Sequence, residues 1–488
     1  MQQIAFDPAD ARAALAQLPQ TPAVFALCFD GVPTDRSSSV GPGAEAHAEP
    51  YIGRTPNLRG RLERLLQPSA KHPRRLQLAG RVRQIRWRLT GSDFESLLAQ
   101  FSLLEGIYGA KALERMHLRQ AAFVRFLGSN AYPRITVTNR PSQREAGWAY
   151  GPFQSRAAAE RFADEALKLF LLRRCTEELD PNPNHPGCVY SEMKMCLAPC
   201  YQGCTDERYG EEASVVQQFL ATRGESRLVT LRTQRDEASA NLEFEAAAAL
   251  HAQVARIESV RALAPELVRP LSQLRAVVLQ ASANPGEVAV FLYENGSLTG
   301  PASFSTLGMR IQNENSGSTS LFAQPMSIEP VPEVAVKGDF GSEMSRNAAF
   351  VSPKAHDSLK EVGFEPDQNS GKCADSTHNS ASEGVILKNV PASPSEAADN
   401  PSAKVARGLL EARMEAALAA LVKLSKTPSP TLRQGHLALL KRWYYRPEVR
   451  RSGEIFFPDA EGHWPVKAML RGVGRVAGKM LIAQNHTE

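Results

Sequence analysis

The sequence lacks the features that mark membrane and secreted proteins. No apolar run approaches the roughly 20 residues needed to cross a bilayer, and the first residues (MQQIAFDPADARAAL) contain no basic stretch leading into an apolar one. Aromatic residues are few, at 7%, and the formal net charge of +5 is too small to indicate a partner by itself. We therefore exclude a membrane protein, disfavour secretion and expect a cytoplasmic chain whose 488 residues form about two to four domains.

Cysteine is scarce but clustered, which favours a metal site over disulfides in a large intracellular chain. Five of the seven cysteines have the spacing C-x12-C-x7-C-x3-C-x3-C: Cys175, Cys188, Cys196, Cys200 and Cys204. Close spacing on a loop rich in proline and glycine lets four sulfurs converge, as an iron–sulfur cluster requires. Tetrahedral zinc fits the same residues, although paired C-x2-C knuckles are its commoner signature. We expect a metal-binding segment at 175–204, with iron–sulfur favoured over zinc.

Positive charge is concentrated in one segment. From Arg54 to Leu89, eleven lysines and arginines stand against one acid, Glu63. A solvated face usually mixes both signs, so this density favours a surface for a polyanion such as nucleic acid. The residues expected to contact DNA are Arg59, Arg64, Lys71, Arg74, Arg75, Arg81, Arg83, Arg86 and Arg88.

Hydrophobic periodicity places this segment in a small α/β unit. Strands are predicted near 22–29, 51–52 and 82–89, and helices near 56–66 and 93–104. The resulting domain spans 15–112 and is followed by a connecting strand and helix at 113–174.

The remaining residues predict an α+β protein with several further parts. Residues 205–262 are almost wholly helix-forming with one break near Asn241, and residues 270–305 resemble a β-meander. Residues 306–404 are rich in Ser, Asn, Pro and Glu, and we expect them to be disordered. A small C-terminal helical module follows at 405–488.

That module contains three successive aromatic residues, Trp443, Tyr444 and Tyr445, followed by arginines. They either stack on nucleic acid or belong to a core helix with a solvated end. We favour the core helix.

Several short blocks, in the right order, resemble the UvrC family, the C subunit of the bacterial UvrABC excinuclease, which has an N-terminal GIY-YIG nuclease domain. YIGRTPNLRGRL at 51–62 is similar to the family's YVGKAKNLRKRL, and KHPRRLQLAGRVRQIRWRLTGSDFESLL at 71–98 to its next basic and helical stretch. YGPF at 150–153 and the run from Arg174–Cys175 to CLAPC at 196–200 are similar to its cysteine region. ASANLEFEAAAALHAQVARI at 238–257 resembles the UVR motif. The resemblance covers about 20–305.

The resemblance implies a cluster and a partner. It points to Cys175, Cys188, Cys196 and Cys200 as ligands of a four-iron four-sulfur cluster, with Cys204 an extra thiol. It also implies that a UVR hairpin at about 226–261 docks on the helicase-like B subunit, UvrB. The expected docking residues are Leu242, Phe244, Ala247, Leu250 and Val254; the alternative is an ordinary hairpin buried by its own chain.

The implied nuclease site is incomplete. Tyr51 matches the family's second catalytic tyrosine, Arg61 its phosphate-stabilising arginine and Arg54 its further basic residue, but Phe25 replaces the first tyrosine and Gln100 the metal-binding glutamate. A neutral amide is a poor substitute, because Mg²⁺ and Mn²⁺ prefer carboxylates.

Two acids close to Gln100 do not repair the set. Glu95 and Glu105 each lie five residues away, about 140° round a helix, so neither readily takes its place. The asparagine that the family carries further on has no counterpart in residues 109–119.

The C-terminal half departs further from the family. Residues 270–305 resemble the β segment ahead of the family's RNase H-like nuclease, but neither that nuclease nor the helix–hairpin–helix repeats are recognisable. The resemblance therefore implies a nucleotide-excision-repair protein, associated with the SOS response, that binds damaged double-stranded DNA and a UvrB-like subunit with impaired incision. The alternative is an active metal-dependent GIY-YIG endonuclease making a single incision.

Overall fold

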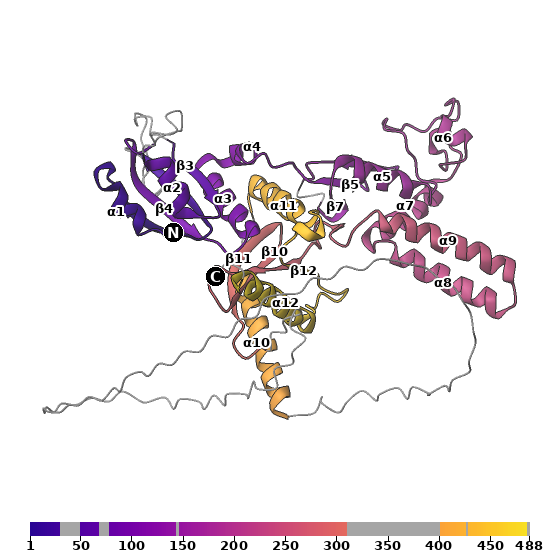
Figure 1. Cartoon of the computed structure of the whole chain (residues 1–488). Coiled ribbons are helices and arrows are strands. Elements are labelled where there is room, and N and C mark those ends of the chain that lie inside the picture. The colour runs from indigo at the N-terminus through magenta and orange to yellow at the C-terminus, as the bar shows by residue number, and fades with distance from the viewer. Residues whose placement is uncertain (30–48, 68–77, 143–145, 310–400, 426–427, 486–488) are drawn as a thin grey trace, which may run out of the picture. The chain divides into compact units, whose positions relative to one another are not determined.

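The structure is a computed structural model that describes residues 1–29, 49–67, 78–142, 146–309, 401–425 and 428–485 (Figure 1). It combines helices with three four-stranded sheets. Most of the segment predicted to be disordered, 310–400, lies outside the described residues. Helix α10 (Pro401–Leu424) begins inside the predicted stretch, so the predicted boundary at 404 is too late. Among the described helices, none is both long and apolar enough to span a membrane.

The first sheet has the order β1-β4-β2-β3, with antiparallel neighbours. Its strands are β1 (Gln2–Ala5), β2 (Ala23–Phe29), β3 (Tyr51–Thr55) and β4 (Val82–Leu89). The prediction of a domain starting at residue 15 misses β1 and helix α1 (Ala11–Ala16). Strand β1 has four residues, mostly exposed, and so gives almost no hydrophobic pattern.

Helices cover both faces of this sheet. Ala23, Phe25 and Leu27 of β2 pack with α1 and with α2 (Leu58–Leu66). Helix α3 (Asp93–Tyr108) lies against β2 and β3. The caps explain where these helices start: the Asn57 side chain accepts a hydrogen bond from the Gly60 amide at 2.8 Å, and Ser92 Oγ accepts one from Glu95 N at 3.1 Å. A short helix, α4 (Ala112–Arg115), follows.

The second sheet has the order β6-β5-β7-β8. Its strands are β5 (Ala122–Phe126), β6 (Ile135–Thr138), β7 (Ala149–Phe153) and β8 (Arg269–Pro270). The prediction of one connecting strand and one helix at 113–174 is therefore too simple. The helices of this region are α5 (Arg156–Leu167), α6 (Val189–Glu192), α7 (Asp206–Ala221), α8 (Glu225–Ala240) and α9 (Phe244–Ala262).

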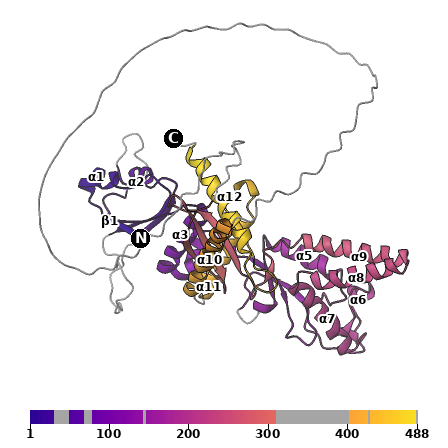
Figure 2. The same ribbon diagram turned by 90° about the horizontal axis from the view of Figure 1, so that it is seen from below.

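Helices α8 and α9 lie side by side in both views (Figure 1 and Figure 2). The predicted break near Asn241 is present, and a second break separates α7 from α8. There Arg223 and Gly224 adopt positive φ values of 54° and 80°, a conformation that ends a helix. The helical region at 205–262 is thus three helices.

The third sheet, β11-β10-β9-β12, joins two segments that the sequence assigns to separate parts. Its strands are β9 (Ala276–Ala281), β10 (Glu287–Glu294), β11 (Ser297–Ser305) and β12 (Glu454–Phe456), and Ile455 of β12 pairs with Val278 of β9. The C-terminal residues therefore do not form a separate helical module. Their strand completes the sheet and their helices cover it.

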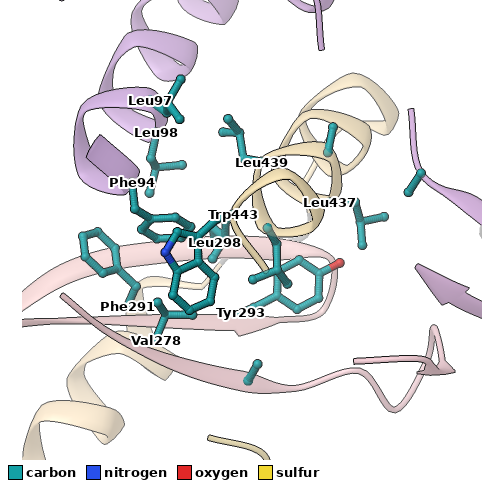
Figure 3. Packing of buried hydrophobic residues seen from close by; sticks show 14 of the residues in the cluster. Phe94, Leu97, Leu98, Val278, Phe291, Tyr293, Leu298, Leu437, Leu439 and Trp443 are labelled. Atoms are coloured by element: carbon teal, nitrogen blue, oxygen red, sulfur yellow. The ribbon is translucent and has the colours of Figure 1, made fainter. Parts of the chain in front are cut away.

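The two faces of this sheet are covered by different helices. Val277 and Leu279 point to a core with α10 and α12 (Val466–Asn485). Val278, Phe291 and Tyr293 point to a core shared with α11 (Pro430–Tyr444) and α3, in which Phe94, Phe291 and Trp443 meet (Figure 3). Helices α11 and α3 thus pack against each other and against this face of the third sheet.

Trp443 is fully buried, its Nε1 donates a hydrogen bond to Ser452 O at 2.9 Å, and Tyr445 Oη donates one to Pro152 O at 2.9 Å. These aromatics belong to the core, as the favoured prediction states. They are not a stacking surface for nucleic acid.

Candidate functional site

Tyr51 and Arg61 are brought together by the turn between β3 and α2. Tyr51 opens β3, and Arg61 lies in the first turns of α2, after the Asn57 cap. Arg61 Nη2 donates to Tyr51 Oη at 3.4 Å, and both side chains are half-buried. The pair presents a phenol and a guanidinium at one point, a combination that can receive a phosphate oxygen.

Phe25 lies beside this pair but contributes no polar atom to it. Phe25 pairs with Gly53 across β2 and β3, and its ring centroid is 6.1 Å from that of Tyr51. The side chain is fully buried. It supplies packing and no proton.

Gln100 lies on α3, where it is half-buried. It follows Asp93 by seven residues, which returns to nearly the same side of a helix. Asp93 on that side contacts Arg54 of β3, so Gln100 shares the side of α3 that contains this ion pair.

Glu95 and Glu105 line a different space, a cleft of about 580 Å³ between α3, β11 and α11. Glu95 Oε2 accepts a hydrogen bond from Gly91 N at 2.9 Å, and Oε1 is 3.8 Å from Arg88 Nη2. Burial raises the pKa of Glu95, against the lowering effects of the Gly91 amide and the Arg88 charge. Both acids face away from the side of Gln100, in agreement with the angle predicted from the sequence.

Arg54 is joined to the C-terminal part of the chain through Asp93. One carboxylate oxygen of Asp93 contacts Arg54, and the other is 2.7 Å from Nη2 of Arg446. Burial alone would raise the pKa of Asp93, but the hydrogen bond from Arg446 and the charge of Arg54 outweigh it, and the pKa is lowered. Sequence reasoning missed the contacts of Asp93 with Arg54 and Arg446, because no periodicity links positions so far apart.

The predicted DNA-contacting residues do not form one uniform surface. Arg81 and Arg83 are exposed at the start of β4, with Arg81 over the Phe29 ring at 5.0 Å. Arg59 and Arg64 donate to backbone oxygens, of Leu18 at 2.7 Å and Gly60 at 2.9 Å.

The other five predicted residues are found elsewhere. Arg86 is half-buried. Burial raises the pKa of Cys28, and the charge of Arg86 and its hydrogen bond to Cys28 oppose this rise. Arg88 lies at the cleft with Glu95. Lys71, Arg74 and Arg75 lie outside the described residues.

Four cysteines form one electrostatic group. Cys196 and Cys200 are buried, Cys175 and Cys188 are half-buried, and all four are free thiols. Burial raises the pKa of Cys196 and of Cys200, amides of Ala198 and Tyr201 lower it, and the charges of Cys188 and Cys175 raise it. Mutual repulsion of thiolates is what a bound cation relieves, and amide donors to sulfur suit a cluster, so these residues fit a metal group.

Cys204 has other neighbours. Its pKa is raised by burial and by the charge of Asp206, and lowered by Arg208. This distinguishes it from the group of four.

Within the described part of the chain, three possible ligand atoms lie within 4.8 Å of one another only at the exposed turn of Asp459, Glu461 and His463. No three of the four cysteine sulfurs therefore lie within 4.8 Å of one another.

The α8–α9 hairpin exposes apolar side chains at its tip. Leu242 is 71% exposed and Phe244 66% exposed, and Leu242 has a positive φ of 63° in the turn. Ala247 and Leu250 are half-buried. Val254 is only 3% exposed and packs in the core of its own chain. The prediction that Val254 contacts a partner is therefore wrong, because the base of the hairpin is already covered by the second sheet's helices.

Two parts of the chain match models of known protein families. Residues 123–220 match the UvrC/Cho excinuclease middle domain, and residues 225–260 match the UvrB/uvrC motif. These parts of the chain are thus similar to a UvrC-type middle domain followed by a UVR motif. Most of the predicted connecting segment at 113–174 and the whole predicted cysteine segment at 175–204 fall within this middle-domain match.

The relatives are named UvrABC system protein C. The chain is 29% identical over 211 residues to the protein of Alcanivorax borkumensis, covering 43% of this chain and 34% of that one. It is 27% identical over 292 residues to the protein of Ruminiclostridium cellulolyticum, covering 59% and 47%. The chain spans less than half the length of these two proteins. No solved structure matches it.

Proposed function

We propose that this chain is a UvrC-like subunit of nucleotide-excision repair that acts in the cytoplasm. It binds damaged double-stranded DNA and a UvrB-like partner, and it incises DNA weakly or not at all. The observation that carries this proposal is the UvrC/Cho middle domain followed directly by a UVR motif.

The exposed tip of the α8–α9 hairpin supports the proposed binding of a UvrB-like partner. Leu242 and Phe244 leave large apolar surfaces in solvent at the turn of the UVR match. A second helical hairpin of the same type buries such a surface with its own apolar side chains. The UvrB-like subunit therefore docks at the tip, and the buried base of the hairpin holds it on the rest of the chain.

The basic residues of the first sheet support DNA binding. Arg81 and Arg83 are exposed, and Arg61 lies beside Tyr51. Replacing Arg81 and Arg83 together by glutamate is expected to weaken binding to duplex DNA and to flatten its dependence on salt. Unchanged affinity and slope would contradict DNA binding by this surface.

The chemistry of the candidate site supports weak incision. Hydrolysis of a phosphodiester needs a proton acceptor or positioned water, charge stabilisation on the phosphate and usually a divalent metal ion, which acts as a Lewis acid. Gln100 offers no charge to such an ion, and Phe25 offers no hydroxyl. Tyr51 and Arg61 remain, so the site retains phosphate binding more fully than catalysis.

A second function, an active endonuclease that makes a single incision, is favoured by one observation. The hydrogen bond from Arg61 to Tyr51 holds together the two residues that match the family's second catalytic tyrosine and its phosphate-stabilising arginine.

The four cysteines support a cofactor. Cys175, Cys188, Cys196 and Cys200 hold a four-iron four-sulfur cluster in this proposal, with zinc as the alternative. Their role is to fix the irregular loop between α5 and α7.

A nicking assay on lesion-containing duplex DNA separates the two functions. It uses anaerobically purified protein with Mg²⁺ or Mn²⁺, with and without the A and B subunits, and compares the natural chain with Gln100→Glu and Tyr51→Phe. We expect no nicking by the natural chain and nicking by Gln100→Glu. Nicking by the natural chain that Tyr51→Phe abolishes would establish the active endonuclease instead.

A further inference from the structure

Asp93 holds two arginines from distant parts of the sequence at one point. Arg54 comes from β3, three residues after Tyr51, and Arg446 follows the end of α11. Each guanidinium contacts a different oxygen of the Asp93 carboxylate. Two positive charges thus converge on one negative charge, which leaves a local excess of one positive charge.

The three side chains remain accessible to solvent. Side-chain exposure is 34% for Arg54, 39% for Asp93 and 26% for Arg446. A guanidinium has five N–H donors in a fixed plane, and the contact with Asp93 occupies only part of them. Donors of both arginines are therefore available to a further anion beside the carboxylate.

Arg446 is held in place by the core. The backbone N–H of Arg446 donates to Trp443 O at 3.2 Å, Trp443 is buried, and Tyr445 is anchored by its hydroxyl on Pro152 O. The neighbouring backbone is thus rigid, so less side-chain freedom is lost when this arginine binds a ligand than on a mobile tail.

We propose that Arg54 and Arg446 together bind one backbone phosphate of DNA, with Asp93 as the positioning residue that aims both guanidiniums at it. This inference rests on the proposed DNA-binding function. It extends the DNA surface from the first sheet to the residues after α11, which the sequence does not connect with that sheet.

The first test measures affinity for duplex DNA at several salt concentrations. Arg446→Gln is expected to weaken binding about tenfold and to reduce the salt slope by about one, the loss of one phosphate contact. Arg446→Lys, which keeps the charge without the fork, should recover part of the affinity. Arg471→Gln is the matched control, because it makes the same charge change on the exposed side of α12. Equal effects of Arg446→Gln and Arg471→Gln would overturn the proposal.

The second test asks whether the arginines act on the same phosphate. Arg54→Gln and Arg446→Gln should each cost about tenfold, and the double variant should lose much less than the product of the two losses. Fully multiplicative losses would contradict a shared phosphate.

Asp93→Ala tests the positioning role, because loss of charge and loss of positioning change the affinity for DNA in opposite directions. Removing a negative charge should tighten DNA binding if charge alone matters, whereas loss of positioning should weaken it. Tighter binding by Asp93→Ala would overturn the positioning role.

Two controls separate the possible failures. Thermal unfolding identifies any variant whose fold is lost, and a purely structural Arg446 would change the unfolding temperature without changing the salt slope. If Arg81→Glu with Arg83→Glu weakens binding while Arg446→Gln does not, this inference fails and the proposed function stands. If the natural chain does not bind DNA, the proposed function itself fails.

Discussion

Phe25 and Gly53 face each other across β2 and β3, and the aromatic ring covers the glycine. A Cβ atom added to Gly53 would lie 2.7 Å from Cζ of Phe25. Phe25 is fully buried and cannot retreat into solvent. The glycine two residues after Tyr51 is therefore required by the close approach of the ring.

Gly53→Ala is expected to lower the free energy of unfolding by about 1–3 kcal/mol, because the ring or the strand must shift. Chemical denaturation measures the change. Gly106→Ala is the control: it lies in α3 with open space around it, so alanine there should leave stability unchanged or raise it. Equal stability of the natural chain and Gly53→Ala would contradict the tight contact.

Val254 and Leu242 should respond in opposite ways to truncation. Val254→Ala removes buried methyl groups and should reduce the free energy of unfolding by about 2 kcal/mol. Leu242→Ala should leave stability nearly unchanged and weaken binding of a UvrB-like subunit, measured by calorimetric titration. Loss of partner binding in Val254→Ala without loss of stability would reverse this assignment.

His436 should make stability depend on pH. It is 4% exposed, its Nδ1 accepts a hydrogen bond from Leu298 N at 2.9 Å, and burial lowers its pKa to about 4. As pH falls, His436 is protonated in the unfolded chain before it is protonated in the folded chain. The stability that depends on neutral His436 is therefore complete above pH 6.5, and about 3 kcal/mol of it is lost as pH falls from 6.5 to about 4.

Denaturant unfolding at several pH values measures this slope, and His436→Asn should flatten it in that window. An unchanged slope would mean that other groups cause the acid sensitivity. The effect of Asp93 falls in a different pH range. Its pKa is lowered in the folded chain, so the stability that it contributes is lost as pH falls below its ordinary pKa of 3.8.

Cys200 and Cys204 should differ in metal retention. Cys200→Ser is expected to lower iron or zinc content by more than half, measured by elemental analysis and visible absorbance, whereas Cys204→Ser should retain it. The reason is that Cys200 shares the charges of Cys175 and Cys188, while Cys204 is influenced by Asp206 and Arg208. Equal metal loss in both variants would contradict the group of four.

Local patterns in the sequence predict the elements around the candidate site well. Strand β4 is predicted with its observed bounds, and α3 begins at the predicted residue 93, although it continues to Tyr108. The position of Arg61 beside Tyr51 follows from a strand, a tight turn and a capped helix. These relationships depend on residues close together in the chain.

Contacts between distant segments could not be predicted in the same way. The ion pairs of Asp93 with Arg54 and Arg446, and the pairing of β12 with β9, join residues that no periodicity relates. The apolar face of α9 was visible in the sequence. Periodicity does not say whether a partner or the chain itself covers it, which is why Val254 was assigned to the wrong surface.

The pairing of β12 with β9 also bears on how the chain is synthesised. Gln280 beside this edge donates to Ser452 O at 3.1 Å across a separation of 172 residues. On the ribosome, β9 emerges long before the strand that covers its edge, and closing so long a loop costs entropy that grows slowly with length. Until that strand arrives, the nascent sheet presents an open edge that invites pairing with other chains. Translation of β12 is therefore the step that closes this edge of the sheet.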